Sequence, residues 1–110
     1  VAYAYLLVAL AEELLFRGFI QGHLNKTFGR PFSFLGIRWG WGLPAAALLF
    51  GLWHFAASFD PAAWPQVLWT AAAGLLFGLV REKSGGVVAP ALLHGVMNYG
   101  PQALLFALFW

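Results

Sequence analysis

The residues best suited to chemistry in this 110-residue chain are a few carboxylates, imidazoles and one carboxamide set in long apolar runs. Glu12 and Glu13 are adjacent, and Arg17 follows Glu13 by four residues, the favourable spacing and order for an ion pair on a helix. Glu12 projects about 100° away from Glu13 on the same helix. We therefore expect a Glu13–Arg17 pair that supports the site, and Glu12 as the unpaired carboxylate.

Two further pairs have the same four-residue spacing. Phe50 and His54 share one helix face, as do His94 and Asn98. A rise of about 1.5 Å per residue places Glu12, His54, His94 and Asn98 at similar depths in their helices. One buried histidine is more often a packing residue, so the hypothesis rests on this coincidence of depth. Such a set can surround a water molecule, with Glu12 as general base and His94 and Asn98 as donors to an oxyanion.

A metal is the main alternative within this site. Glu12, His54 and His94 are a sufficient ligand set for a catalytic zinc with one open position. A ligating imidazole normally has a second partner, and the sequence offers neither histidine a carboxylate if Glu13 is paired with Arg17. We therefore favour a metal-free reaction in which Glu12 takes the proton of a water that His54 orients. Zinc stays possible, and the sequence commits the protein to no cofactor.

The composition is that of a membrane protein. Hydrophobic residues make up 62% of the chain and charged residues 9%, against about 25% charged in ordinary soluble domains. We predict an all-α, polytopic membrane helix bundle of about four transmembrane helices. The expected spans are residues 1–23, 43–59, 65–80 and 87–110. The last span is expected to be kinked or split at Gly100-Pro101.

Charge in the connections predicts the topology. The loops at 25–42 and 81–86 contain lysine and arginine, whereas the loop at 60–65 contains neither. By the positive-inside rule we expect a multi-pass protein whose two basic loops face the cytoplasm. The 81–86 segment is expected to be a flexible turn.

Residues 1–110 are expected to form a single domain. Because Val1 already lies inside an apolar run, we expect the chain to be a piece of a longer protein with preceding helices. The absence of cysteine excludes a disulfide framework and a thiol nucleophile. The sequence also lacks a His-Glu-x-x-His motif, a Gly-x-Ser-x-Gly elbow, a second aspartate, a phosphate-binding loop and a nucleic-acid patch.

The chain resembles a known family, the CPBP intramembrane proteases, also called the Abi or CAAX-protease-like family. Three motifs carry the resemblance in order: Glu12-Glu13-x-x-x-Arg17, Phe50-x-x-x-His54 and His94-x-x-x-Asn98. The resemblance implies that Glu12 and His54 activate the attacking water. It also implies that His94 and Asn98 stabilise the oxyanion, with Glu13 and Arg17 in support. We expect Phe50 to line the site rather than to react.

The leading functional hypothesis is an intramembrane endopeptidase, CAAX prenyl-protease-like, that cuts a peptide or lipidated-protein substrate near the cytoplasmic face. The alternative is a non-catalytic membrane protein, such as a bacteriocin-immunity factor, that binds a peptide in the same cavity. A proton or ion carrier is less favoured because transporters of that kind usually contain internal repeats. The expected partners are the substrate and the lipid bilayer, not nucleic acid.

Overall fold

A computed structural model describes residues 2–58 and 60–109. The chain is mostly helical, and all four expected helical regions are present. The first is made of α1 (Ala2–Glu13), the π-helix η1 (Leu14–Gln21) and α2 (Gly22–Phe28). The other three are α3 (Gly42–Ser58), α4 (Trp64–Ser84) and α5 (Val88–Phe109). Within the described ranges, no helix is both long enough and apolar enough to cross a bilayer.

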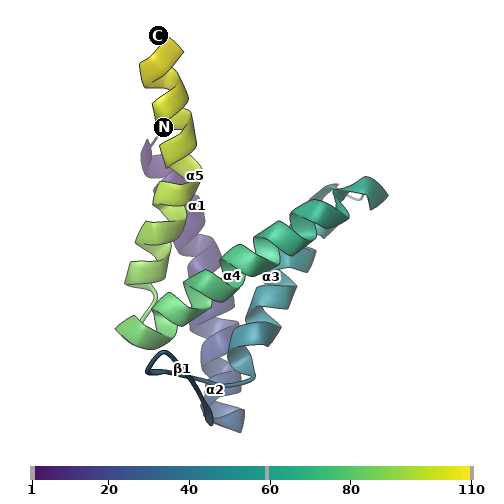
Figure 1. The fold of residues 1–110 in the computed structure, drawn as a ribbon, viewed down its shortest axis with the longest axis vertical. Helices are drawn as coiled ribbons and strands as arrows, with labels where there is room; N and C mark the ends of the chain where they lie inside the picture. Colours follow the sequence, from purple (N-terminus) through teal and green to yellow (C-terminus); the bar gives the residue numbers. More distant parts are fainter. Residues whose placement is uncertain (1, 59, 110) are drawn as a thin grey trace.

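The helices form two antiparallel pairs. Helix α1 lies beside α5, and α3 lies beside α4 (Figure 1). In that view the two pairs diverge like the arms of a V, and η1 continues α1 to pack against α3 where the arms meet. The sequence 60–65 therefore lies at the far end of the α3–α4 arm, away from α2.

The first helical region is continuous but not uniformly α-helical. The π-helical stretch η1 covers eight residues, although π-helix mostly occurs as single-turn bulges, often at functional sites. The sequence did not predict it, because the spacing of its apolar residues also fits an α-helix. The region ends at Phe28, where Gly29 adopts a positive φ of 73°.

The segment 25–42 was expected to be a loop and contains a small hairpin, so the all-α prediction is wrong here. Strands β1 (Phe32–Phe34) and β2 (Ile37–Trp39) pair antiparallel, and Phe32 lies opposite Trp39 with ring centroids 4.7 Å apart. The two turn residues, Leu35 and Gly36, both have positive φ, 51° and 80°. Two such residues suit a tight hairpin turn with the twist of the flanking strands.

The connections around α3 and α4 match the predicted boundaries in part. Pro44 lies in the first turn of α3, where its missing N–H has no intrahelical acceptor. Asp60 caps the short 3₁₀ helix η2 (Pro61–Ala63) by accepting from the Ala62 amide at 3.0 Å. The predicted flexible turn at 81–86 is wrong for its first four residues, because α4 continues to Ser84 and the chain turns only at Gly85.

Helix α5 runs without a break through Gly100-Pro101, so the split alternative for the last span is wrong. A proline removes one intrahelical hydrogen bond, which can bend a helix without ending it.

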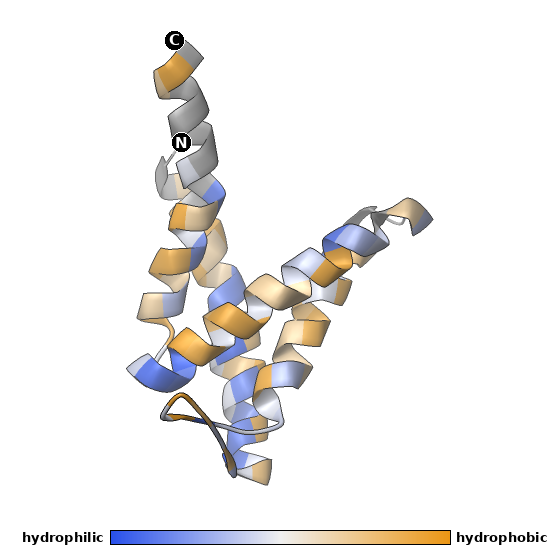
Figure 2. Cartoon of the chain, in the orientation of Figure 1, coloured by the Kyte–Doolittle hydropathy of each residue, from blue (hydrophilic) through white to orange (hydrophobic). Residues whose placement is uncertain are grey.

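The core where the arms meet is aromatic. Phe16, Phe50 and Phe77 form its buried cluster. Large apolar side chains also cover much of the outer helix surfaces, and hydrophilic residues gather where α2, the hairpin and the end of α4 meet (Figure 2).

Candidate active site

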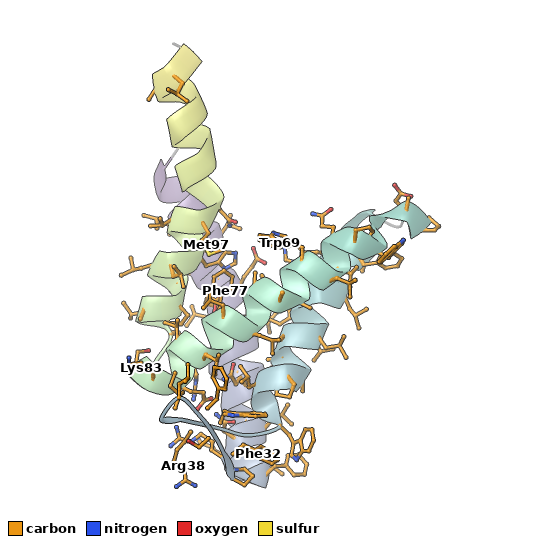
Figure 3. All side chains as sticks on the ribbon, in the orientation of Figure 1. Phe32, Arg38, Trp69, Phe77, Lys83 and Met97 are labelled. Carbon is orange, nitrogen blue, oxygen red and sulfur yellow. The ribbon has the colours of Figure 1, made fainter. Side chains whose placement is uncertain are left out.

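A pocket of about 330 Å³ lies where α3, α4 and α5 come together. His54 and Phe50 enter it from α3, and His94 and Asn98 from α5. Helix α4 contributes the remaining wall, which includes Trp69 and Phe77. Figure 3 labels these two residues and Met97, which lines the pocket from α5. The structure thus brings three of the four predicted reactive side chains to one pocket.

Glu12 reaches the same place from the end of α1. Its Oε2 lies 3.7 Å from Nε2 of His54. This oxygen is buried and has no hydrogen-bond donor within reach among the described residues. The two side chains stay partly accessible, 19% for Glu12 and 30% for His54.

The other ring nitrogen of His54 fixes its tautomer. Nδ1 lies 2.8 Å from the carbonyl oxygen of Phe50. Because a carbonyl only accepts, Nδ1 must carry a hydrogen, and Nε2 of the neutral ring is then an acceptor facing Glu12. Two acceptors therefore face each other, an arrangement that requires a proton or a water between them.

His94 is held by a carboxylate. Its Nδ1 lies 2.9 Å from Oε1 of Glu13, and both side chains are almost fully buried. The ring also stacks on Phe77, with centroids 4.7 Å apart and planes at 18°. The expectation that neither histidine has a carboxylate partner is wrong for His94, because Glu13 serves His94 and Arg17 together.

Arg17 forms the predicted ion pair with Glu13 and also contacts α4 and the ring of Phe50. Its Nε lies 3.4 Å from Oε2 of Glu13, and both side chains have no exposed area. Its Nη2 donates to the carbonyl of Gly74 on α4 at 2.8 Å. The guanidinium also lies 4.6 Å from the ring centroid of Phe50, within cation–π range.

The glycine at position 74 makes that contact possible. A Cβ there would lie 2.9 Å from Nη2 of Arg17 and 3.1 Å from Cα of Ala47. Only glycine leaves room for both the guanidinium and the neighbouring helix.

The geometry does not fit the suggested zinc site. Among the residues that the structure describes, no three histidine or acidic side chains gather closely enough to hold a metal ion. The candidate ligands separate into two pairs: Glu12 with His54, and His94 with Glu13.

Comparison with known proteins identifies the family. Residues 1–100 match the type II CAAX prenyl endopeptidase Rce1-like family. The chain belongs to this family. The match covers every residue placed around the pocket, and a peptidase family agrees with a buried carboxylate–histidine site.

One curated relative of this Rce1-like chain is an uncharacterized protein, YpbD, from Bacillus subtilis (strain 168). The two are 30% identical over 93 residues, which is 84% of this chain and 39% of the relative. The chain thus spans well under half of the relative's length. No solved structure matches it.

Sequence reasoning missed a second buried polar cluster in this Rce1-like chain, centred on Glu82 near the end of α4. Gln21 and Asn25 each donate to its Oε1 at 2.6 Å. Arg30 pairs with its Oε2 at 3.1 Å, and Arg81 lies 3.4 Å from Oε1. A repeat of polar residues every four positions, Glu13, Arg17, Gln21 and Asn25, is the signal in the sequence that could have revealed a polar face here.

Proposed function

We propose that this chain is the catalytic core of an intramembrane endopeptidase in which Glu12 and His54 activate a water molecule. The observation that carries the proposal is the 3.7 Å gap between Oε2 of Glu12 and Nε2 of His54, two acceptors without a donor between them. A water that bridges these two atoms from the side can donate one hydrogen to each acceptor. Glu12 then takes the proton as the water attacks a peptide carbonyl, and returns it to the leaving amine.

His94 and Asn98 serve in this proposal as donors to the oxyanion. Both line the pocket that contains His54. Glu13 holds Nδ1 of His94 at 2.9 Å, so Nε2 is the nitrogen left to face the substrate. Nε2 donates in the imidazolium form of His94, in which Nδ1 donates to the Glu13 carboxylate. Asn98 adds a neutral donor, and such donors stabilise charge that develops in the transition state.

We further propose that the core lies in a lipid bilayer with its basic segments at the cytoplasmic face. Exposed leucine, phenylalanine and tryptophan side chains cover the outer faces of the helices. The basic segments 25–42 and 81–86 meet at one end of the molecule, where Arg30 contacts Glu82. A peptide or lipidated protein of the CAAX type is the proposed substrate, in keeping with the family's description.

The test is digestion of a peptide library that includes prenylated CAAX-type peptides, by the purified protein with and without chelator. Glu12→Gln is expected to abolish turnover, because an amide cannot take the proton, and to leave thermal unfolding unchanged. Glu12→Asp is the matched control: it keeps a carboxylate and should retain measurable turnover. Wild-type turnover by Glu12→Gln would rule out this mechanism.

The same assay separates the catalytic proposal from the non-catalytic alternative. Saturable peptide binding by the wild-type protein without any cleavage product would favour the peptide-binding or immunity function. Loss of turnover on removal of a tightly bound zinc, with recovery when zinc is restored, would instead make the metal part of the reaction.

A further inference from the structure

We infer that a second pocket, at the basic end of the molecule, binds a phosphate group. This pocket has a volume of about 420 Å³ and lies between η1, α2 and the end of α4. Its lining includes two glycines, Gly18 and Gly22, and three cationic residues, Lys26, Arg30 and Arg81. It shares no lining residue with the candidate active site.

The charge around this pocket is strongly asymmetric. Five of the chain's six lysines and arginines lie in residues 26–38 and 81–83, together with a single acid, Glu82. Figure 3 shows Arg38 and Lys83 at this same end of the molecule. Five positive charges and one negative charge leave a net of four positive charges there, which attracts an anion.

The one acid does not face the pocket. Glu82 has no exposed side-chain area, and its two oxygens are already engaged by Gln21, Asn25, Arg30 and Arg81. Glu82 thus orients two arginines without presenting negative charge to a ligand. Lys26 is exposed at the pocket and completes the cationic side.

Arg81 is placed to use its remaining donors. Its Nε donates to the Arg17 carbonyl at 3.2 Å, and its Nη1 lies 3.4 Å from Glu82. Its Nη2 lies beside Gly22, 3.3 Å from where a Cβ there would be, and both residues line the pocket. Two of the three guanidinium nitrogens are thus held by the protein, and the third is available to donate to a phosphate oxygen in the pocket.

The phosphate can come from a phospholipid headgroup or from a soluble anion, and titration calorimetry of the purified protein in an uncharged detergent distinguishes them. The probes are sodium phosphate, dihexanoyl phosphatidic acid and, as a zwitterionic comparator, dihexanoyl phosphatidylcholine. Saturable binding of phosphatidic acid and of phosphate defines a general phosphate site. If only phosphatidic acid binds saturably, the site is assigned to a phospholipid headgroup. If only phosphate binds saturably, the site is assigned to a soluble anion.

Two charge reversals decide whether the pocket is responsible. Lys26→Glu should weaken binding about tenfold, since it replaces an attractive contact with a repulsive one. Lys83→Glu is the matched control, because Lys83 is also exposed and its reversal changes the net charge identically, but Lys83 does not line this pocket. It should weaken binding less than about twofold. Equal losses in the two variants, or no saturable binding of phosphatidic acid or phosphate, would overturn the inference.

Discussion

Glu13 is the residue on which the buried part of the site depends, because its carboxylate serves His94 through one oxygen and Arg17 through the other. Both partners are almost fully buried, so water cannot solvate either side chain. Removing one member of such a pair leaves an uncompensated buried charge, at a cost of about 3–5 kcal/mol.

Glu13→Gln is therefore expected to lower the free energy of unfolding by about 3–5 kcal/mol and to reduce turnover as well. Glu12→Gln should change the free energy of unfolding by less than about 1 kcal/mol, because Glu12 is partly exposed and has no short contact. Thermal unfolding of the two variants beside the wild type measures the difference. Equal destabilisation would contradict the division of labour between the two glutamates.

At this scale the sequence predicts local pairs and misses distant ones. Glu13–Arg17 and the Phe50–His54 and His94–Asn98 faces follow from four-residue spacing. The Glu13–His94 contact joins residues 81 positions apart, and Glu82 meets Gln21 across 61 positions. No periodicity within one helix encodes such contacts, since they depend on which faces of separate helices meet.

Among the elements, α4 depends on its two glycines to approach the first helical region. Arg17 donates to the carbonyl of Gly74, and Gln21 donates to that of Gly78 at 3.2 Å. A Cβ at position 78 would collide with Cδ1 of Leu43 on α3. The spacing visible in the sequence, Gly74-x-x-x-Gly78, thus makes room for polar side chains as well as for a neighbouring helix.

Gly74→Ala is expected to destabilise the protein by about 1–3 kcal/mol, because the added methyl group meets Arg17 and the backbone of α3. Gly18→Ala is the matched helical control, since its nearest side-chain atom, on Val87, lies at an ordinary 3.4 Å. Thermal unfolding of the two variants is the measurement. A Gly74→Ala protein as stable as Gly18→Ala would show that the α3–α4 contact is looser than described.

The elements that the sequence missed are those decided by distant packing. The hairpin lies in a stretch rich in glycine and proline that gives no long alternating pattern, and its strands are only three residues each. In the sequence, the last turn of α4 resembles a charged loop. In the structure it is helical, and Gln21, Asn25 and Arg30 contact Glu82 there. Long apolar helices with ordinary start and stop signals, such as α3, were predictable within one or two residues.

For the whole molecule, Glu82 ties together three parts of the chain: the first helical region, the segment before the hairpin and the end of α4. Glu82→Gln is expected to cost about 2–4 kcal/mol, since two arginines lose their buried counter-charge. Limited proteolysis should then cut the 30–40 segment faster than in the wild type. Lys83 is an exposed neighbour of Glu82, so Lys83→Gln should leave the cleavage rate unchanged. Equal cleavage rates in the two variants would contradict the role of Glu82 in holding the three parts of the chain together.

The proposed orientation in the bilayer is tested by single cysteines, which are clean probes because the chain contains none of its own. Ser33→Cys and Ser84→Cys lie at the basic end and should react only with reagent on the cytoplasmic side. Ala62→Cys lies in η2, the segment that joins α3 to α4, and should react only from the opposite side. Labelling of positions 33 and 84 from opposite sides would rule out the orientation.

The π-helix η1 also predicts which changes in length the protein tolerates. The backbone hydrogen bonds of a π-helix span five residues, one more than those of an α-helix. Deleting one residue within Leu14–Gln21 therefore converts this stretch towards α-helix. Because the wide turn takes up the extra residue, the helix before it and the helix after it keep nearly the same relative rotation when one residue is removed, and Glu12 stays near His54. A one-residue insertion instead rotates the helix before it by about 100° relative to the helix after it, and Glu12 turns away from His54. Leu14 and Leu15 are about half exposed and should accept many apolar replacements. A library of variants should therefore be permissive to apolar substitution at these two positions and should tolerate a one-residue deletion between Glu13 and Gln21 better than a one-residue insertion.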